Sequence, residues 1–156
     1  MINNLKIIFG LSLFVLLFGC DPNRVLDHNS PIDKIGWYRL KPITEVVTIN
    51  DTKQKHNFYI NIRNNNEYPY SNIYMFINTK VPSGKSSRDT VECVLADVDG
   101  KWLGKSSGDI SDHRILIKQN VLFPDSGTYT FEIEHAMRVE NLLGITDVGL
   151  RIEKAK

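Results

Sequence analysis

Residues 104–108 match a sequence pattern found in serine hydrolases. Gly104-Lys105-Ser106-Ser107-Gly108 fits G-x-S-x-G, in which a strained strand-to-helix turn exposes the serine beside an oxyanion hole. The residues that follow, Asp109-Ile110-Ser111-Asp112, show no helical period. We therefore interpret this stretch as a flexible loop and expect that the protein is not an enzyme.

Two further stretches resemble the end of a phosphate-binding loop. They are Gly84-Lys85-Ser86 and Gly104-Lys105-Ser106. Such a loop needs a second glycine five positions before the last one, so that backbone amides can surround the phosphates. Thr79 and Asp99 stand at those positions. We expect no nucleotide to bind.

The sequence predicts no metal site and no cofactor. His28, His56, His113 and His135 lack the close spacing of metal ligands, and Cys93 shares a predicted strand face with Val91 and Leu95. Asp97-Val98-Asp99-Gly100 begins like a calcium loop, but its glycine comes early and no glutamate follows at the twelfth position. A hairpin turn accounts for that glycine. A calcium site shared with Asp109 and Asp112 is the alternative.

Cys20 carries the most specific chemical signal in the chain. Residues 1–6 are polar with one basic side chain, and the apolar run 7–18 is shorter than the roughly 20 residues of a membrane span. Residues 17–20, Leu-Phe-Gly-Cys, resemble a bacterial lipobox, although Phe18 is larger than is usual there. We predict a signal peptide over residues 1–19 and lipid attachment at Cys20. An ordinary secretory leader is the alternative.

A lipid at Cys20 would place the protein in the cell envelope. Two or more acyl chains hold a protein stably on a membrane. Resemblance to bacterial lipoproteins implies several chains here, palmitate among them. The leaflet depends on how sorting machinery reads Asp21 and its neighbours, and we expect the periplasmic face of the outer membrane. From this location we expect no nucleic-acid partner.

Size and charge predict one neutral domain. Without residues 1–19 the chain would keep 137 of its 156 residues, with 18 acidic and 18 basic side chains because Lys6 is the one charged residue of the leader. A balanced surface argues against a polyanion partner. With Cys20 acylated, Cys93 has no disulfide partner, so the hydrophobic core must stabilise the fold.

The mature chain divides into a tether and a β-rich body. Residues 20–33 are polar with two prolines, so we predict a lipidated tether followed by a single domain over 34–156. Period-two alternation of apolar residues predicts strands in seven segments, at residues 45–50, 56–63, 73–80, 90–96, 114–118, 128–135 and 148–153. Trp37 and Tyr38 are expected at the core or its rim.

Turn residues separate these segments. Asp99-Gly100 predicts a two-residue hairpin, and no proline interrupts an alternating run. One or two helical turns are expected over residues 136–143, ending at Gly144. The spacing predicts an all-β fold, an antiparallel β-sandwich of the jelly-roll or immunoglobulin-like kind, preceded by a cleaved signal helix.

Three groups of residues together resemble the GldH gliding-motility lipoproteins. They are residues 63–74 (RNNNEYPYSNIY), residues 89–97 (DTVECVLAD) with 100–104 (GKWLG), and residues 135–138 (HAMR) with 144–153 (GITDVGLRIE). The resemblance covers nearly the whole mature chain. It implies a non-enzymatic envelope lipoprotein required for gliding, associated with other gliding lipoproteins and the type IX secretion apparatus. It supplies no catalytic residues.

Aromatic residues beside turns are the candidate partner contacts. We single out Tyr68, Pro69, Tyr70 and Trp102, with Met137-Arg138 as a second group. Exposed anchors that cluster with Trp37 would favour protein recognition. A flat, solvent-facing aromatic row would favour a carbohydrate-binding module, which is the alternative function. Packing at the edge of the core is an equally good interpretation of the aromatic residues.

Overall fold

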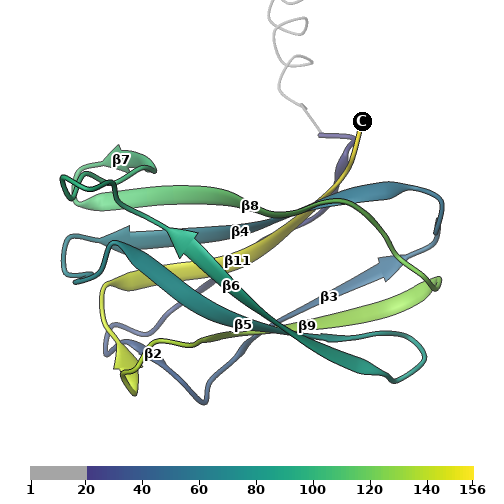
Figure 1. Ribbon diagram of the computed structural model, residues 1–156, viewed down its shortest axis with the longest axis horizontal. Helices are drawn as coiled ribbons and strands as arrows, with labels where there is room; N and C mark the ends of the chain where they lie inside the picture. Colours follow the sequence, from purple (N-terminus) through teal and green to yellow (C-terminus); the bar gives the residue numbers. More distant parts are fainter. Residues whose placement is uncertain (1–20) are drawn as a thin grey trace, which may run out of the picture.

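The computed structural model describes residues 21–156, which form two packed antiparallel sheets and no helix (Figure 1). The predicted signal peptide and Cys20 lie outside the described residues. Over residues 21–156 there is consequently no helix of the length and apolarity that crossing a bilayer requires. The strands are β1 (Arg24–Pro31), β2 (Trp37–Tyr38), β3 (Ile43–Ile49), β4 (Lys55–Asn65), β5 (Asn72–Lys80), β6 (Ser86–Val94), β7 (Lys105–Ser107), β8 (Ile110–Leu122), β9 (Gly127–His135), β10 (Asn141–Leu142) and β11 (Ile145–Lys154).

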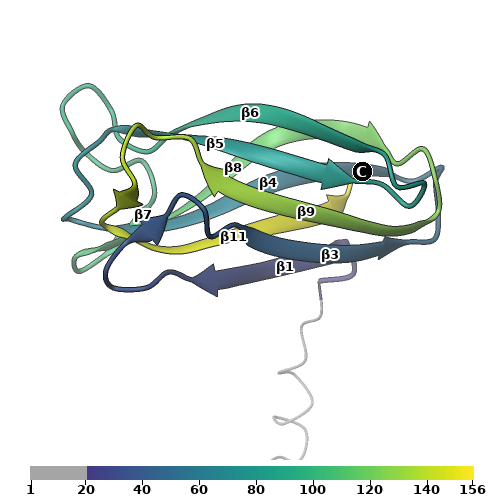
Figure 2. The ribbon, with the colours of Figure 1, turned by 90° about the horizontal axis from the view of Figure 1, so that it is seen from below.

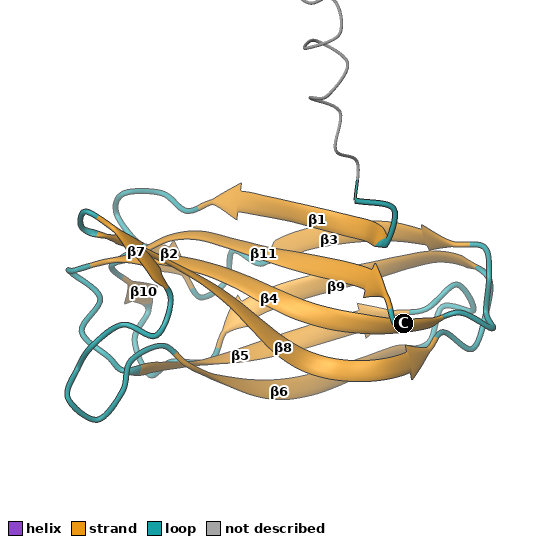
Figure 3. Cartoon of the chain, turned by 90° about the horizontal axis from the view of Figure 1, so that it is seen from above, coloured by secondary structure: helices purple, strands orange, loops and turns teal. Residues whose placement is uncertain are grey.

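The two sheets are the layers of a β-sandwich, as predicted. One sheet has five strands in the order β1-β11-β4-β8-β7, and the other has four in the order β3-β9-β5-β6. Figure 3 shows the five-stranded sheet in front of the other. A third, two-stranded pairing joins β2 to β10 at one end of the sandwich.

The core forms because each strand turns its apolar residues to one side. In β4 and β11 the inward residues face each other across the ladder, as in the pairs Ile60↔Leu150 and Ile62↔Val148. All four of these side chains are at most 1% exposed. The opposite sheet contributes residues of the same kind, including Ile73, Met75, Tyr129, Phe131 and Ile133. The predicted alternation is therefore confirmed. Each of the seven predicted strands begins earlier than expected, whereas β3 and β6 end at residues 49 and 94, before the predicted 50 and 96.

Cys93 and three of the histidines also lie inside. The Cys93 thiol is fully buried, and this burial raises its pKa to about 12. Cys93 therefore behaves as a small apolar core residue rather than as a nucleophile. His135 is fully buried and meets the Trp37 ring edge to face at 5.4 Å. Within residues 21–156, neither ring nitrogen of His135 has a hydrogen-bond partner, and desolvation lowers its pKa.

The predicted tether is wrong over most of its length. Residues Arg24–Pro31 form β1, an edge strand paired with β11 from Arg24↔Glu153 to Pro31↔Asp147. A register shift between Arg24 and Leu26 breaks the period-two pattern, which is why the sequence does not show the strand. The sandwich therefore begins almost directly after residue 20.

Two local predictions need correction. Residues 136–143 form no helical turn, and Asn141–Leu142 pair instead with Tyr38 and Trp37. At Asp99-Gly100 the hairpin has a three-residue loop, because Asp97 N donates to Lys101 O while Gly100 N donates to Asp97 O. Gly100 alone has the positive φ, 81°, which fits a type I turn closed by a glycine bulge.

The long connections gather at one end of the sandwich, as Figures 1 and 2 show. We call this the loop end. It consists of residues 32–42, 66–71, 95–104 and 136–144. The opposite end carries the short turns β3–β4, β5–β6 and β8–β9, and the C-terminus lies on that side.

Candidate functional site

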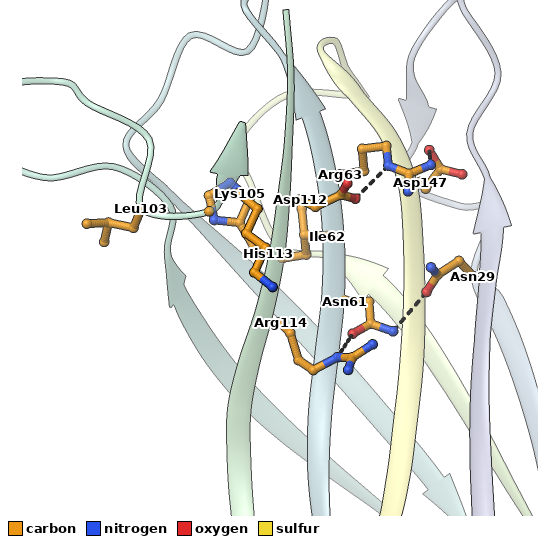
Figure 4. Close-up of a pocket in the computed structure, with 11 residues that line it drawn as sticks. Asn29, Asn61, Ile62, Arg63, Leu103, Lys105, Asp112, His113, Arg114 and Asp147 are labelled. Carbon is orange, nitrogen blue, oxygen red and sulfur yellow. Dashed lines mark hydrogen bonds and ion pairs between the residues drawn. The ribbon is translucent and has the colours of Figure 1, made fainter. Parts of the chain in front are cut away.

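A polar groove of about 520 Å³ lies on the outer face of the five-stranded sheet (Figure 4). Strands β1, β4, β7, β8 and β11 each contribute side chains to it. The lining residues are Asn29, Asn61, Ile62, Arg63, Leu103, Gly104, Lys105, Asp112, His113, Arg114 and Asp147. Because β4 and β8 are in register, their outward-facing polar residues meet across the ladder.

At one side of the groove, Arg63 joins two carboxylates. Its Nε donates to Asp112 Oδ1 at 2.6 Å, and its Nη1 lies 3.5 Å from Asp147 Oδ2. These contacts raise the pKa of Arg63, the Asp112 hydrogen bond most of all. The guanidinium is thus held in place by its neighbours.

Asn61 organises the other side of the groove. Its amide nitrogen donates to Asp27 Oδ1 at 2.9 Å and Asn29 Oδ1 at 3.0 Å, while its oxygen accepts from Arg114 Nε at 3.1 Å. Arg114 Nη2 also reaches Asp27 Oδ2 at 3.4 Å. The polar groups on this side are therefore satisfied by one another.

The same network continues along the face to Arg151. Its guanidinium contacts Asp27 at 2.6 Å, Asp21 at 2.5 Å and Glu153 at 2.8 Å. The hydrogen bond from Arg151 lowers the pKa of Asp21, and hydrogen bonds from Tyr59 and then Arg151 lower that of Glu153. The outer face is thus a continuous array of paired charges.

Among the described residues, the groove offers no hydroxyl or thiol nucleophile. No serine, threonine or cysteine is among its lining residues in the described chain. His113 Nε2 forms a 2.9 Å hydrogen bond with Asn64 Oδ1, and burial lowers the pKa of His113. Ser106 lies in β7, which turns directly into β8, so its pattern forms a hairpin without the helix that a nucleophile elbow requires. The arrangement suits binding of a polar surface through charges and amides.

Two of the four carboxylates considered for calcium form other contacts. Asp97 Oδ1 accepts from the backbone nitrogens of Asp99 and Lys101, and Asp112 pairs with Arg63. Across residues 21–156, no group of three or more His, Cys, Asp or Glu side chains is placed to hold a metal.

The predicted aromatic contacts meet at the loop end, with different exposures. Tyr68 is buried and donates its hydroxyl to Asn72 O at 2.7 Å, so it belongs to the core. Pro69 and Tyr70 are exposed, and Trp102 is half-buried with its Nε1 3.3 Å from Asn66 Oδ1. The Tyr68 and Tyr70 rings meet at 73°, so these rings do not form a flat row. Exposed anchors clustered with Trp37 would have favoured protein recognition. Trp37 is instead fully buried and is not an exposed member of the cluster.

The second group of predicted contacts, Met137 and Arg138, also differs in exposure. Met137 packs against the core and its sulfur lies 3.4 Å from Tyr74 N, whereas Arg138 is exposed. Both lie at the loop end with Tyr70. Sequence reasoning missed the groove, although the outward positions of Asn61 and Arg63 in an alternating strand were the available signal.

Fold and anchor signal together define a class of protein. A β-sandwich that follows a predicted lipoprotein signal is an envelope lipoprotein domain. The chain belongs to the GldH lipoprotein family, whose model matches residues 24–152. It is therefore a gliding-motility lipoprotein of all-β fold.

Two relatives support this assignment. The chain is 36% identical to a gliding motility lipoprotein GldH homolog of Christiangramia forsetii, over 94% of this chain and 97% of the relative. It is 35% identical to the gliding motility lipoprotein GldH of Flavobacterium johnsoniae, over 90% and 91% of the two chains.

Proposed function

We propose that this protein is anchored by lipid at Cys20 and acts without catalysis as a structural or assembly partner in gliding. Its partners would be other gliding lipoproteins and the type IX secretion apparatus, reached from the periplasmic face of the outer membrane. Family membership supports the process. Exposed apolar side chains at the loop end support the mode of action.

The observation that carries this proposal is where the large exposed hydrophobic residues lie. The loop end holds Ile35, Tyr38, Leu40, Tyr70, Val98, Leu103 and Leu143, each at least 37% exposed. Apolar and aromatic groups gathered on one surface are typical of protein interfaces. The described chain begins beside the C-terminal strand, where Lys154 N donates to Asn23 O at 2.8 Å, and this end lies away from the loop end (Figures 1 and 3). A protein held at one end and apolar at the other is suited to present the loop end to a partner.

Confinement to a membrane strengthens such contacts. Partners held on the same membrane meet at raised effective concentration, so a modest interface can suffice. The described groove, by contrast, is lined by residues that already pair with one another. The loop end is therefore the better candidate for a protein partner.

Site-specific photo-crosslinking in gliding cells tests the proposal. A photoreactive residue at Tyr70 or Leu143 should capture envelope proteins of the gliding or secretion machinery. The matched control places the same photoreactive residue at Val46, which is 54% exposed on the four-stranded sheet. Capture no stronger at Tyr70 than at Val46 would count against the loop end.

Function and anchoring need separate readouts. Tyr70→Ala combined with Leu143→Ala should abolish spreading at normal protein levels, whereas Val46→Ala should not. Mass spectrometry of the mature N-terminus should find an acylated cysteine. Binding on a glycan array, with no protein captured, would favour the carbohydrate-binding alternative.

A further inference from the structure

The first described residues are fixed to the outer face of the five-stranded sheet. Asp21 contacts the Arg151 guanidinium at 2.5 Å, and the Arg151 side chain is only 10% exposed. Asn23 N donates to Asp21 Oδ1 at 3.1 Å, while Lys154 N donates to Asn23 O at 2.8 Å. Figure 1 shows this segment beside the C-terminus, on the side of the sandwich formed by β8, β4 and β11.

A lipid on Cys20 would consequently have no tether. One residue spans at most about 3.6 Å, so the anchored cysteine stays within about that distance of Asp21. A flexible linker of 14 residues, the predicted tether, would instead reach about 20 Å and let the domain tumble. Because β1 takes up the chain from Arg24, the domain lacks that freedom.

The face next to Asp21 is polar and evenly charged. It carries the cations Lys105, Arg63, Arg114 and Arg151, with Arg24 opposite Glu153, and the anions Asp21, Asp27, Asp112, Asp147 and Glu153. A basic patch would draw the protein to anionic lipids. A balanced face has no such attraction, and it matches the paired phosphate and amine charges of zwitterionic headgroups.

We infer that the outer face of the five-stranded sheet lies against the phospholipid headgroups of the anchoring leaflet. This inference rests on the lipid anchor of the proposed function, and it adds an orientation. The polar groove then opens toward the headgroup layer. The outer face of the four-stranded sheet points away from the membrane, which leaves that face and the loop end accessible.

Two variants, each with one added cysteine, measure this orientation. One variant is Leu116→Cys, because Leu116 is paired with Tyr59 on the inferred membrane face. The other is Val46→Cys, because Val46 lies on the outer face of the four-stranded sheet. The parent side chains are similarly exposed, 46% and 54%, and Cys93 is too buried to be labelled. Each lipidated protein carries a fluorophore at the new thiol and is reconstituted into vesicles of phosphatidylethanolamine and phosphatidylcholine. A fraction of the lipid bears a headgroup spin label that quenches at short range.

We expect at least about twofold stronger quenching at position 116 than at position 46, since the sheets lie about 10 Å apart. Ten Gly/Ser residues inserted between Cys20 and Asp21 give a reach of about 17 Å and should make the two sites equal. Equal quenching without the insertion, or stronger quenching at position 46, would overturn the orientation. Protein that does not float with vesicles and has an unmodified Cys20 would overturn the lipid anchor instead.

Discussion

Replacing Arg151 by methionine tests whether the paired charges of the outer face stabilise the sandwich. The Arg151 guanidinium contacts Asp27, Asp21 and Glu153 at 2.6, 2.5 and 2.8 Å. Methionine retains an apolar stem of similar reach. It leaves three carboxylates close together without their shared cation.

The expected cost follows from the burial of these groups. Removing one partner of a fully buried ion pair destabilises a protein by about 3–5 kcal/mol. Asp27 and Glu153 keep 17% and 23% of their side chains exposed, so water recovers part of that loss. We expect the free energy of unfolding to fall by about 2–3 kcal/mol at neutral pH, and Tm by roughly 6–12 °C.

This loss should depend on pH in a definite direction. The pKa values of Asp21 and Glu153 lie below their ordinary values of 3.8 and 4.5. Carboxyls with lowered folded pKa values stabilise the fold above the unfolded pKa, and that stabilisation is lost as pH falls through the folded pKa. The parent protein therefore loses this contribution in acid. The deficit of Arg151→Met shrinks there, because protonated carboxyls no longer repel.

Urea denaturation followed by far-ultraviolet circular dichroism, at pH near 7 and at about pH 3.5, measures both effects. Arg138→Met is the matched control, because Arg138 is exposed and forms no ion pair within residues 21–156. The control should stay within about 0.5 kcal/mol of the parent. A deficit for Arg151→Met as small as that of the control, or the same deficit at both pH values, would refute the reasoning.

Three further predictions concern turns and buried groups. Gly144→Ala should destabilise by more than about 2 kcal/mol in thermal denaturation, because φ is 81° and a Cβ would collide with the Tyr68 backbone. Gly84→Ala, with φ of 86° and no atom within 4 Å, should cost only about 1 kcal/mol, and equal losses would contradict this explanation. Cys93 should react with a thiol reagent only after unfolding, and a fast reaction in the native protein would disprove its burial. Since burial lowers the pKa of His135 below 6.5, the unfolded chain binds the proton more readily, and the free energy of unfolding should fall as pH drops below that value. His135→Phe should flatten this decline in denaturant titrations at pH values between about 7 and 5, and an unchanged slope would exclude His135 as its source.

The sequence predicts the strands that bury one face and are flanked by turn residues. In β4 the alternation of Phe58, Ile60 and Ile62 with polar residues is visible in the chain itself, and the structure buries all three. The same logic fails for β1, because it is an edge strand with a register shift and few apolar residues. Local pattern identifies a strand only where the strand contributes regularly to the core.

The polar groove could not be predicted in this way. Asp27 and Arg151 are 124 residues apart, and their contact depends on the register between β1 and β11. Alternation shows which side of a strand a residue occupies, but it does not identify the residue opposite. Trp37 illustrates the same limit, because its place in the core is expected from the sequence and is confirmed, whereas its pairing with the distant Leu142 could not be predicted.

Pairing of the first strand with the last has a consequence for export. A chain that crosses a membrane from its N-terminus delivers residue 20 and β1 long before β11 emerges. Between β1 and β4 in the finished sheet lies β11, so the sheet stays incomplete until the final residues arrive. Under the proposed lipid attachment at Cys20, the modifying enzymes would therefore meet an unfolded polypeptide, and the domain would close against the membrane only after translocation ends.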